Sequence, residues 1–237
     1  MRMTLETWIK KAEGYLATDT PPSWADWESD EDHPPGLFAP ARCDSRAGTL
    51  RPDVGPEFYE WADLILCHQD SHGAAILYQI LWRLTHGEKN LLRIKTDDQM
   101  RRLELMCRAV VTDIHRMKGF VRFKKILLNG IETYGAWYEP DHFIVPRVAG
   151  FFRSRFALMR WVIFTPGGCL FWDCHRLRFG PGLARDPGLR DDYDDLWQTY
   201  YKATFNPSRA NPKLLRAHMP QRFWKNLPEL RGFNSPV

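Results

Sequence analysis

The feature that most constrains the fold is a change in hydrophobic period at Gly119. Before it, apolar residues recur at helical spacing over residues 97–118, and after it residues 120–125 alternate with a period of two. The apolar stripe of the helical segment consists of Leu103, Met106, Cys107, Val110, Val111 and Ile114. The sequence therefore predicts a long helix that ends at Gly119 and leads into a strand.

The segments that follow predict an α+β fold. Asn129-Gly130 is a hairpin turn signal, and residues 134–139 supply a second strand. Residues 143–156 again have helical spacing, and two further strand-like segments, 161–165 and 169–174, flank a Pro-Gly-Gly turn. The order strand, strand, helix, strand, strand favours an antiparallel sheet built from two hairpins, with helices packed on it.

The N- and C-terminal regions are predicted to be helical. Helical spacing occurs over residues 3–16, 57–67, 74–86 and about 193–205. Thr96 with Gln99 is a candidate capping box for the long helix. Residues 19–32 hold six acidic residues and no Lys or Arg, and prolines and glycines continue to residue 55. We therefore expect residues 1–55 to be an N-terminal helix with an acidic, proline-rich connection, and residues 56–237 to be a single α+β domain.

Composition narrows the class of protein. Of the 237 residues, 44% are hydrophobic and 26% charged, as in a globular protein. No apolar run reaches the roughly 18–20 residues of a membrane span, so we expect a soluble, cytoplasmic protein without a membrane partner. The five cysteines contain no CxxC pair, and no metal or cofactor motif is present, so we expect neither a metal nor a cofactor.

The densest group of cations covers the end of the long helix and the start of the first strand. It consists of His115, Arg116, Lys118, Arg122, Lys124 and Lys125. One or two such charges would stabilise a helix C-terminus through its dipole. The group continues along alternate positions of the expected strand, which suits contact with phosphates, and a solvated basic face is the alternative.

A second group, Glu139 to His142, is expected at the open end of the first hairpin. If the chain turns at Asn129-Gly130, residues 120 and 139 lie opposite each other, so His115 would be a neighbour. Glu139, Asp141, His142 and His115 are therefore candidate catalytic residues that could activate a water molecule. Alternatively, Asp141 caps the following helix and Glu139 pairs with an arginine.

A third group lies in the basic tail from Lys202 to Arg231, where seven Lys or Arg face one Glu. The candidate nucleic-acid contacts in this tail are Arg209, Asn211, Lys213, Arg216, Arg222 and Lys225. Aromatic rings between these residues could stack on bases. Alternatively, Phe223, Trp224 and the other rings of the tail pack into the core, which is the favoured reading for apolar rings at helical spacing.

Four segments carry a resemblance to a known family. They are HRMKGFVRF, WYEPDHFIVPRVAGFFRSRF, MRWVIFTPGGCLFWD and LWQTYYKATFNPSRANPKLLRAHMPQRFWKNLPE. Together they resemble a family of DNA-metabolism proteins of unknown function, found alone beside radical SAM proteins or fused N-terminal to a uracil-DNA glycosylase domain. The resemblance implies matched positions without roles, at residues 115–119, 122, 139–142, 209, 211, 220 and 224.

Three hypotheses about function follow. The first is a protein of DNA repair or DNA metabolism that recognises damaged or modified DNA through its basic residues. The second is an enzyme that hydrolyses or excises a damaged base, in which Glu139 or Asp141 activates water and a histidine transfers a proton. The third is an interaction domain for a uracil-DNA glycosylase or a radical SAM protein. DNA is the expected partner in the first two.

Overall fold

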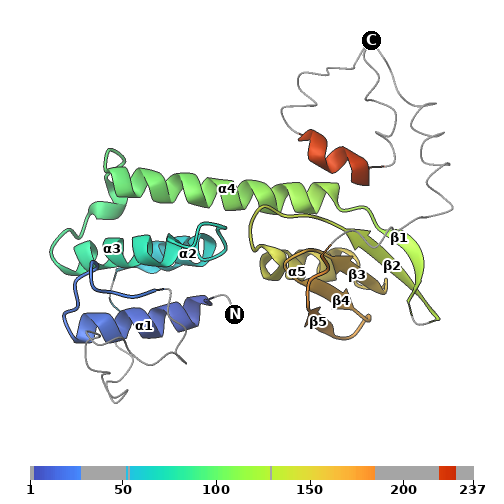
Figure 1. Ribbon diagram of the computed structural model, residues 1–237, viewed down its shortest axis with the longest axis horizontal. Helices are drawn as coiled ribbons and strands as arrows, with labels where there is room; N and C mark the ends of the chain where they lie inside the picture. The colour runs from blue at the N-terminus through green and yellow to red at the C-terminus, as the bar shows by residue number, and fades with distance from the viewer. Residues whose placement is uncertain (1–2, 28–51, 53, 129, 185–218, 228–237) are drawn as a thin grey trace, which may run out of the picture. The chain divides into compact units, whose positions relative to one another are not determined.

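The computed structural model describes residues 3–27, 52, 54–128, 130–184 and 219–227 (Figure 1). The chain divides into two compact units, Met1–Val111 and Thr112–Val237, and the boundary falls within the long helix α4. The division expected at residue 56 lies inside the first unit. That residues 56–237 can fold as one domain stays a prediction.

The first unit is helical. Its elements are α1 (Leu5–Ala17), α2 (Pro56–Ile65), α3 (Gly73–Thr85), the 3-10 turn η1 (Leu91–Arg93) and the first half of α4 (Asp98–Phe120). Thr4 accepts the N–H of Thr7 over 3.2 Å and so begins α1, and a proline begins α2. Helices α1, α2 and α3 lie within two residues of their predicted bounds, because their apolar spacing and end signals are local.

An aromatic core holds the helices of the first unit together. Trp8 and Phe58 are fully buried, and the indole N–H of Trp8 donates to the carbonyl of Ala74 over 3.1 Å. The hydroxyl of Tyr78 likewise donates to the carbonyl of Thr20 over 2.7 Å. Burial of these rings, with their polar atoms satisfied, joins α1, α2 and α3.

Helix α4 differs from its prediction at both ends. Asp97, rather than Thr96, begins it, since one carboxylate oxygen of Asp97 accepts the N–H groups of Gln99 and Met100 at 3.0 and 3.1 Å. At the other end the helix runs through Gly119 to Phe120. The expected stop at Gly119 is therefore wrong, because a glycine tolerates helical backbone where tertiary packing favours it.

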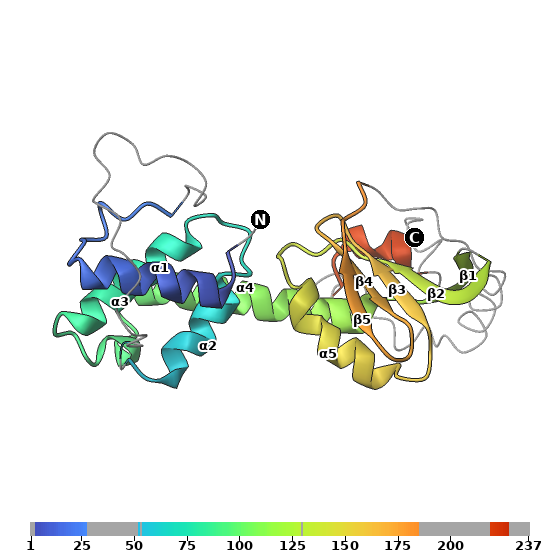
Figure 2. The same ribbon diagram turned by 90° about the horizontal axis from the view of Figure 1, so that it is seen from below.

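The second unit contains a five-stranded sheet with helices, so the predicted α+β fold class is confirmed (Figures 1 and 2). Its strands are β1 (Lys124–Leu128), β2 (Ile131–Trp137), β3 (Trp161–Phe164), β4 (Cys169–Trp172) and β5 (Leu177–Gly180). They lie side by side in chain order, and all neighbours are antiparallel except β2 and β3. The parallel pair arises because helix α5 (Val145–Arg155) returns the chain to the same end of the sheet.

The two predicted hairpins are confirmed. Leu128 pairs with Ile131 and Lys124 with Gly135, so the first hairpin turns between Leu128 and Ile131, and Gly130 within this interval has a φ of 75°. However, β1 begins at Lys124 rather than residue 120, so Arg122 lies in the connection after α4. Strand β5 was not predicted, because it has only four residues and the alternation of Leu177, Arg178 and Phe179 is too short to distinguish a strand from a loop.

One face of the sheet packs against helix α5. Trp161, Ile163 and Leu170 are fully buried on this face. Helix α5 packs there through Phe152, whose ring centroid is 6.1 Å from that of Trp161.

Among the described helices, none is long and apolar enough to cross a membrane.

Candidate functional site

Asp113 is a buried acid in α4 and is only 1% exposed. Its Oδ2 accepts the backbone N–H of His142 over 2.9 Å, while Oδ1 has no hydrogen-bond partner within the described residues. Burial raises the pKa of Asp113 to about 6, because loss of solvent disfavours the ionised form more than the neighbouring backbone N–H groups favour it. Asp113 therefore changes its protonation state not far from neutral pH.

Tyr138 lies beside this acid at the end of β2. It is 1% exposed, and its hydroxyl also lacks a hydrogen-bond partner in the described part of the chain. Burial, and next the charge of Asp113, raise the pKa of the Tyr138 phenol. The ring of Phe223, from the 3-10 helix η3 (Gln221–Asn226), stacks on Tyr138 with centroids 5.1 Å apart and planes 6° from parallel.

Arg222 forms a two-point ion pair with Asp141. Its two terminal nitrogens donate to the two carboxylate oxygens, and its guanidinium carbon is 4.6 Å from the ring centroid of Phe223. Arg222 lowers the pKa of Asp141, and Asp141 raises that of Arg222. The two side chains are 46% and 31% exposed, so this pair reaches solvent. We call Asp113, Tyr138, Asp141 and Arg222 the acid–arginine cluster.

The four predicted catalytic residues occupy different environments. Asp141 belongs to the acid–arginine cluster, and His142, which is 7% exposed, contributes its backbone N–H to Asp113. Glu139 is half-buried and His115 is exposed on α4. Asp141 does not cap α5, because Ile144 occupies the position before that helix and no side chain caps it. Its partner is Arg222 instead.

The cations predicted to contact phosphates make contacts inside the protein. The Lys118 ammonium lies 5.1 Å from the ring centroid of Phe151, and Arg122 donates to the carbonyl of Gly119 over 2.7 Å. Lys124 is only 8% exposed. Arg116 is near enough to lower the pKa of Asp141. Phosphate contact by these four residues stays a prediction.

The tail residues are described only in part. Arg209, Asn211, Lys213 and Arg216 lie outside the described residues, as does the predicted helix over residues 193–205. Lys225 falls within η3, but its side chain lies outside the described part of the structure. Phe223 and Trp224 are 1% and 5% exposed, which confirms that these two rings pack in the core.

The acid–arginine cluster combines groups suited to proton transfer and anion binding. A carboxyl group with a pKa near 6 can give or accept a proton, and a guanidinium can hold a phosphate oxygen. Among the residues that the structure describes, no group of three or more His, Cys, Asp or Glu could hold a metal ion.

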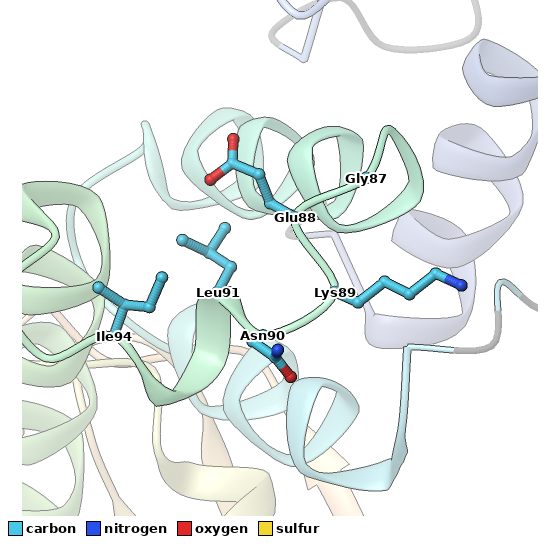
Figure 3. Close-up of a pocket in the computed structure, with 6 residues that line it drawn as sticks. All are labelled: Gly87, Glu88, Lys89, Asn90, Leu91 and Ile94. Atoms are coloured by element: carbon cyan, nitrogen blue, oxygen red, sulfur yellow. The ribbon is translucent and has the colours of Figure 1, made fainter.

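Two surface pockets lie elsewhere. The pocket in the first unit has a volume of about 380 Å³ and is lined by Gly87, Glu88, Lys89, Asn90, Leu91 and Ile94 (Figure 3). Arg83 holds the Glu88 carboxylate by hydrogen bonds of 2.9 and 2.7 Å, and Figure 3 shows Lys89 pointing away from Leu91. The other pocket, about 460 Å³, is lined by residues 154–159. Neither pocket contains a residue of the acid–arginine cluster.

Sequence reasoning missed Asp113 and Tyr138. A signal for Asp113 was present, since it lies three residues after Val110 and four before Met117, and both of these are buried. It is thus an acid on the apolar face of a helix, a position that acids rarely occupy without a function or a partner. Tyr138 offered no such signal, because a tyrosine in a strand is ordinary.

A family model described as a domain of unknown function, DUF4130, matches residues 71–229. No curated protein matches, and neither does any solved structure.

Proposed function

Since the chain belongs to the DUF4130 family, whose function is unknown, its activity has to be inferred from its own chemistry, and we propose that it is a DNA-binding protein of DNA repair or DNA metabolism. It would recognise damaged or modified DNA through the basic surface of the second unit. The resemblance of its four long segments to DNA-metabolism proteins supports DNA, rather than another polyanion, as the ligand.

The observation that carries this proposal is a separation of charge between the two units. Residues 1–111 contain 13 Lys and Arg against 18 Asp and Glu, a formal charge of −5. Residues 112–237 contain 20 against 11, a formal charge of +9. The modest net charge of the whole chain hides this difference. An excess of positive charge confined to one unit is the electrostatic pattern expected of a nucleic-acid-binding protein.

The test is the salt dependence of DNA binding. Fluorescence anisotropy with labelled duplex and single-stranded oligonucleotides should show an affinity that falls steeply between 50 and 200 mM salt, because each phosphate contact releases counterions. Undamaged DNA should be compared with DNA that carries uracil, an abasic site, an alkylated base or a crosslink. Negligible binding to all of them at low salt would contradict the proposal.

A matched pair of double variants tests whether the second unit carries the binding. Arg153 and Arg155 are exposed on α5, and Arg93 and Arg101 are exposed in the first unit. Arg153→Ala with Arg155→Ala should reduce both the affinity and the salt slope. Arg93→Ala with Arg101→Ala removes the same charge from the acidic unit and should change both much less. Equal effects of the two double variants would rule out a site confined to the second unit.

An enzymatic role is a second candidate, favoured by the acid–arginine cluster. It joins the buried Asp113, whose pKa is raised to about 6, to the solvent-reaching pair of Asp141 and Arg222. Such a site would suit hydrolysis or excision of a damaged base, with Asp141 activating water and Arg222 holding a phosphate. A product-resolved screen of the damaged DNAs tests it: a specific product that disappears in Asp141→Asn supports catalysis, and no product from any substrate excludes it for those lesions.

An interaction domain is the remaining candidate, and its proposed partners are a uracil-DNA glycosylase or a radical SAM protein. The basic unit would then dock an acidic surface of the partner. Pull-down with each candidate partner, together with a measurement of DNA affinity, distinguishes protein docking from DNA binding. Loss of the partner in Arg122→Ala and Arg216→Ala, with unchanged DNA affinity, would favour protein docking over DNA binding.

A further inference from the structure

The sheet face opposite to that of Trp161 and Leu170 carries a basic and aromatic patch over β4 and β5, next to Val162, which is buried on the same face. In the sheet register Phe171 of β4 pairs with Arg178 of β5, so both side chains lie on the same face. Arg160 precedes the buried Trp161 and so points to the Phe171 face, where its guanidinium carbon is 5.5 Å from the ring centroid of Phe171. We call Arg160, Phe171, Asp173, Arg176 and Arg178 the sheet-face patch.

Phe171 differs from its neighbours in burial. Leu170 and Trp172 are buried on the face that packs against α5, whereas Phe171, on the other face, is only partly buried. Arg176 and Arg178 are exposed. An aromatic ring that reaches solvent between guanidinium groups is a surface on which a planar, electron-rich ring can stack.

Asp173 orders this patch. Its Oδ1 accepts the backbone N–H groups of His175 and Arg176 at 3.0 and 2.6 Å, which closes the turn between β4 and β5. These two N–H groups lower the pKa of Asp173, and its Oδ2 lies 3.3 Å from a terminal nitrogen of Arg178. With three arginines and this one acid, the patch keeps a net positive charge.

We propose that the sheet-face patch binds single-stranded DNA, with an unpaired base stacked on Phe171 and the flanking phosphates held by Arg160, Arg176 and Arg178. This inference rests on the proposed DNA binding, and it adds a preference for single strands and the residues that contact them. Single strands suit the patch because their bases offer free faces, whereas the bases of a duplex are covered by their neighbours. Phosphate contacts alone would bind a duplex equally well. The partly exposed ring of Phe171 is therefore the feature that favours single-stranded over duplex DNA.

The test compares affinities of the full-length chain for a single-stranded oligonucleotide and its duplex. Phe171→Ala should weaken single-strand binding about tenfold through loss of a stacked base, and leave duplex binding nearly unchanged. Arg160→Gln and Arg178→Gln should each reduce the single-strand salt slope by about 0.7. Phe171→Trp keeps an aromatic ring and should preserve binding, which separates stacking from folding.

Phe179→Ala is the matched control. Phe179 is exposed on the neighbouring strand, but its register partner is Leu170, so it belongs to the opposite face of the sheet. This variant should leave both affinities unchanged. Binding of single strands that Phe171→Ala does not weaken, or that Phe179→Ala weakens equally, would overturn the sheet-face site alone.

Two further outcomes have separate meanings. Absence of binding to both forms of DNA would overturn the proposed function itself. A strong preference of the same chain for single-stranded RNA of the same sequence would overturn the assignment to DNA.

Discussion

The backbone N–H of His142 donates to Oδ2 of Asp113 over 2.9 Å, and this bond ties the connection between β2 and α5 to helix α4. The acceptor is a carboxyl group almost without solvent, next to the equally buried phenol of Tyr138. The bond therefore fixes the segment that carries Asp141, and it does so at the cost of burying an acid. This balance makes the stability of the second unit depend on pH.

We predict that Asp113→Asn stabilises the protein at neutral pH. The pKa of Asp113 is about 6 in the folded protein and near 3.8 unfolded, so the folded state binds more protons and loses stability as pH rises from about 4 to 6. An amide still accepts the His142 N–H and carries no charge, but its buried NH2 group takes the place of the unpartnered Oδ1, so the variant should gain less than about 3 kcal/mol at pH 7 and nothing at pH 4. Chemical denaturation at several pH values measures this.

A second substitution at the same position provides the control. Asp113→Ala removes the acceptor as well as the charge and leaves the His142 N–H unpaired, so it should gain less than Asp113→Asn at every pH. If the stability of Asp113→Asn relative to the natural protein were independent of pH, the raised pKa would be disproved.

We next predict that Asp141→Asn strengthens DNA binding. The variant releases the guanidinium of Arg222, so the affinity for DNA at low salt should rise severalfold. The salt dependence should steepen by the amount that corresponds to at most one additional phosphate contact. The ion pair is partly exposed and its loss should cost less than about 1 kcal/mol of stability. Because the pKa of Asp141 is lowered, this small stabilisation is present above about pH 4 and is lost as pH falls further.

Glu132→Gln is the control for this effect. Glu132 is also an exposed acid of the second unit and pairs with Lys125 over 2.8 Å, so its loss changes the net charge by the same amount. A gain in affinity confined to Asp141→Asn would show that Arg222 itself reaches DNA. Equal gains in the two variants would show a general effect of charge or of released cations, Lys125 included, rather than a contact specific to Arg222.

Phe223→Ala should release η3 from the second unit. The ring is 1% exposed and contacts both Tyr138 and Phe120, at 5.1 and 5.6 Å between centroids. Truncation of a buried phenylalanine typically costs about 3 kcal/mol or more, and Phe223→Leu should lose much less. Limited proteolysis should then cut near η3 faster in Phe223→Ala, and an unchanged cleavage rate would argue against this packing.

Gly182→Ala should destabilise the segment after β5. A Cβ atom at this position would lie 1.9 Å from the carbonyl oxygen of Pro166, where the chain is held by a 3.0 Å bond from Leu183 N–H to the carbonyl of Thr165. We expect a loss of about 1–3 kcal/mol in thermal or chemical unfolding. Gly180→Ala is the control, since its nearest contact would be an ordinary 3.8 Å, and equal losses would contradict the steric explanation.

Local signals accounted for much of the fold and for less of the site. Asn129-Gly130 correctly placed the first hairpin, because a two-residue turn determines its own register. Arg122 was predicted to lie in a strand, but α4 ends at Phe120 and β1 begins at Lys124, so Arg122 lies in the connection between them and donates to the Gly119 carbonyl. Alternation of side chains over a few residues cannot distinguish a strand from the end of a helix when long-range packing extends the helix.

The sequence by itself determined the alternation of helices and strands, the α+β class and the excess of positive charge beyond residue 112, because these follow from spacing and composition. Only the tertiary structure paired Arg222 with Asp141, buried Asp113 beside Tyr138 and set Arg160 over Phe171. The physical reason is that side-chain charge and hydrogen bonding at these sites depend on neighbours distant along the chain. Such neighbours are selected by the packing of the whole unit rather than by any local pattern.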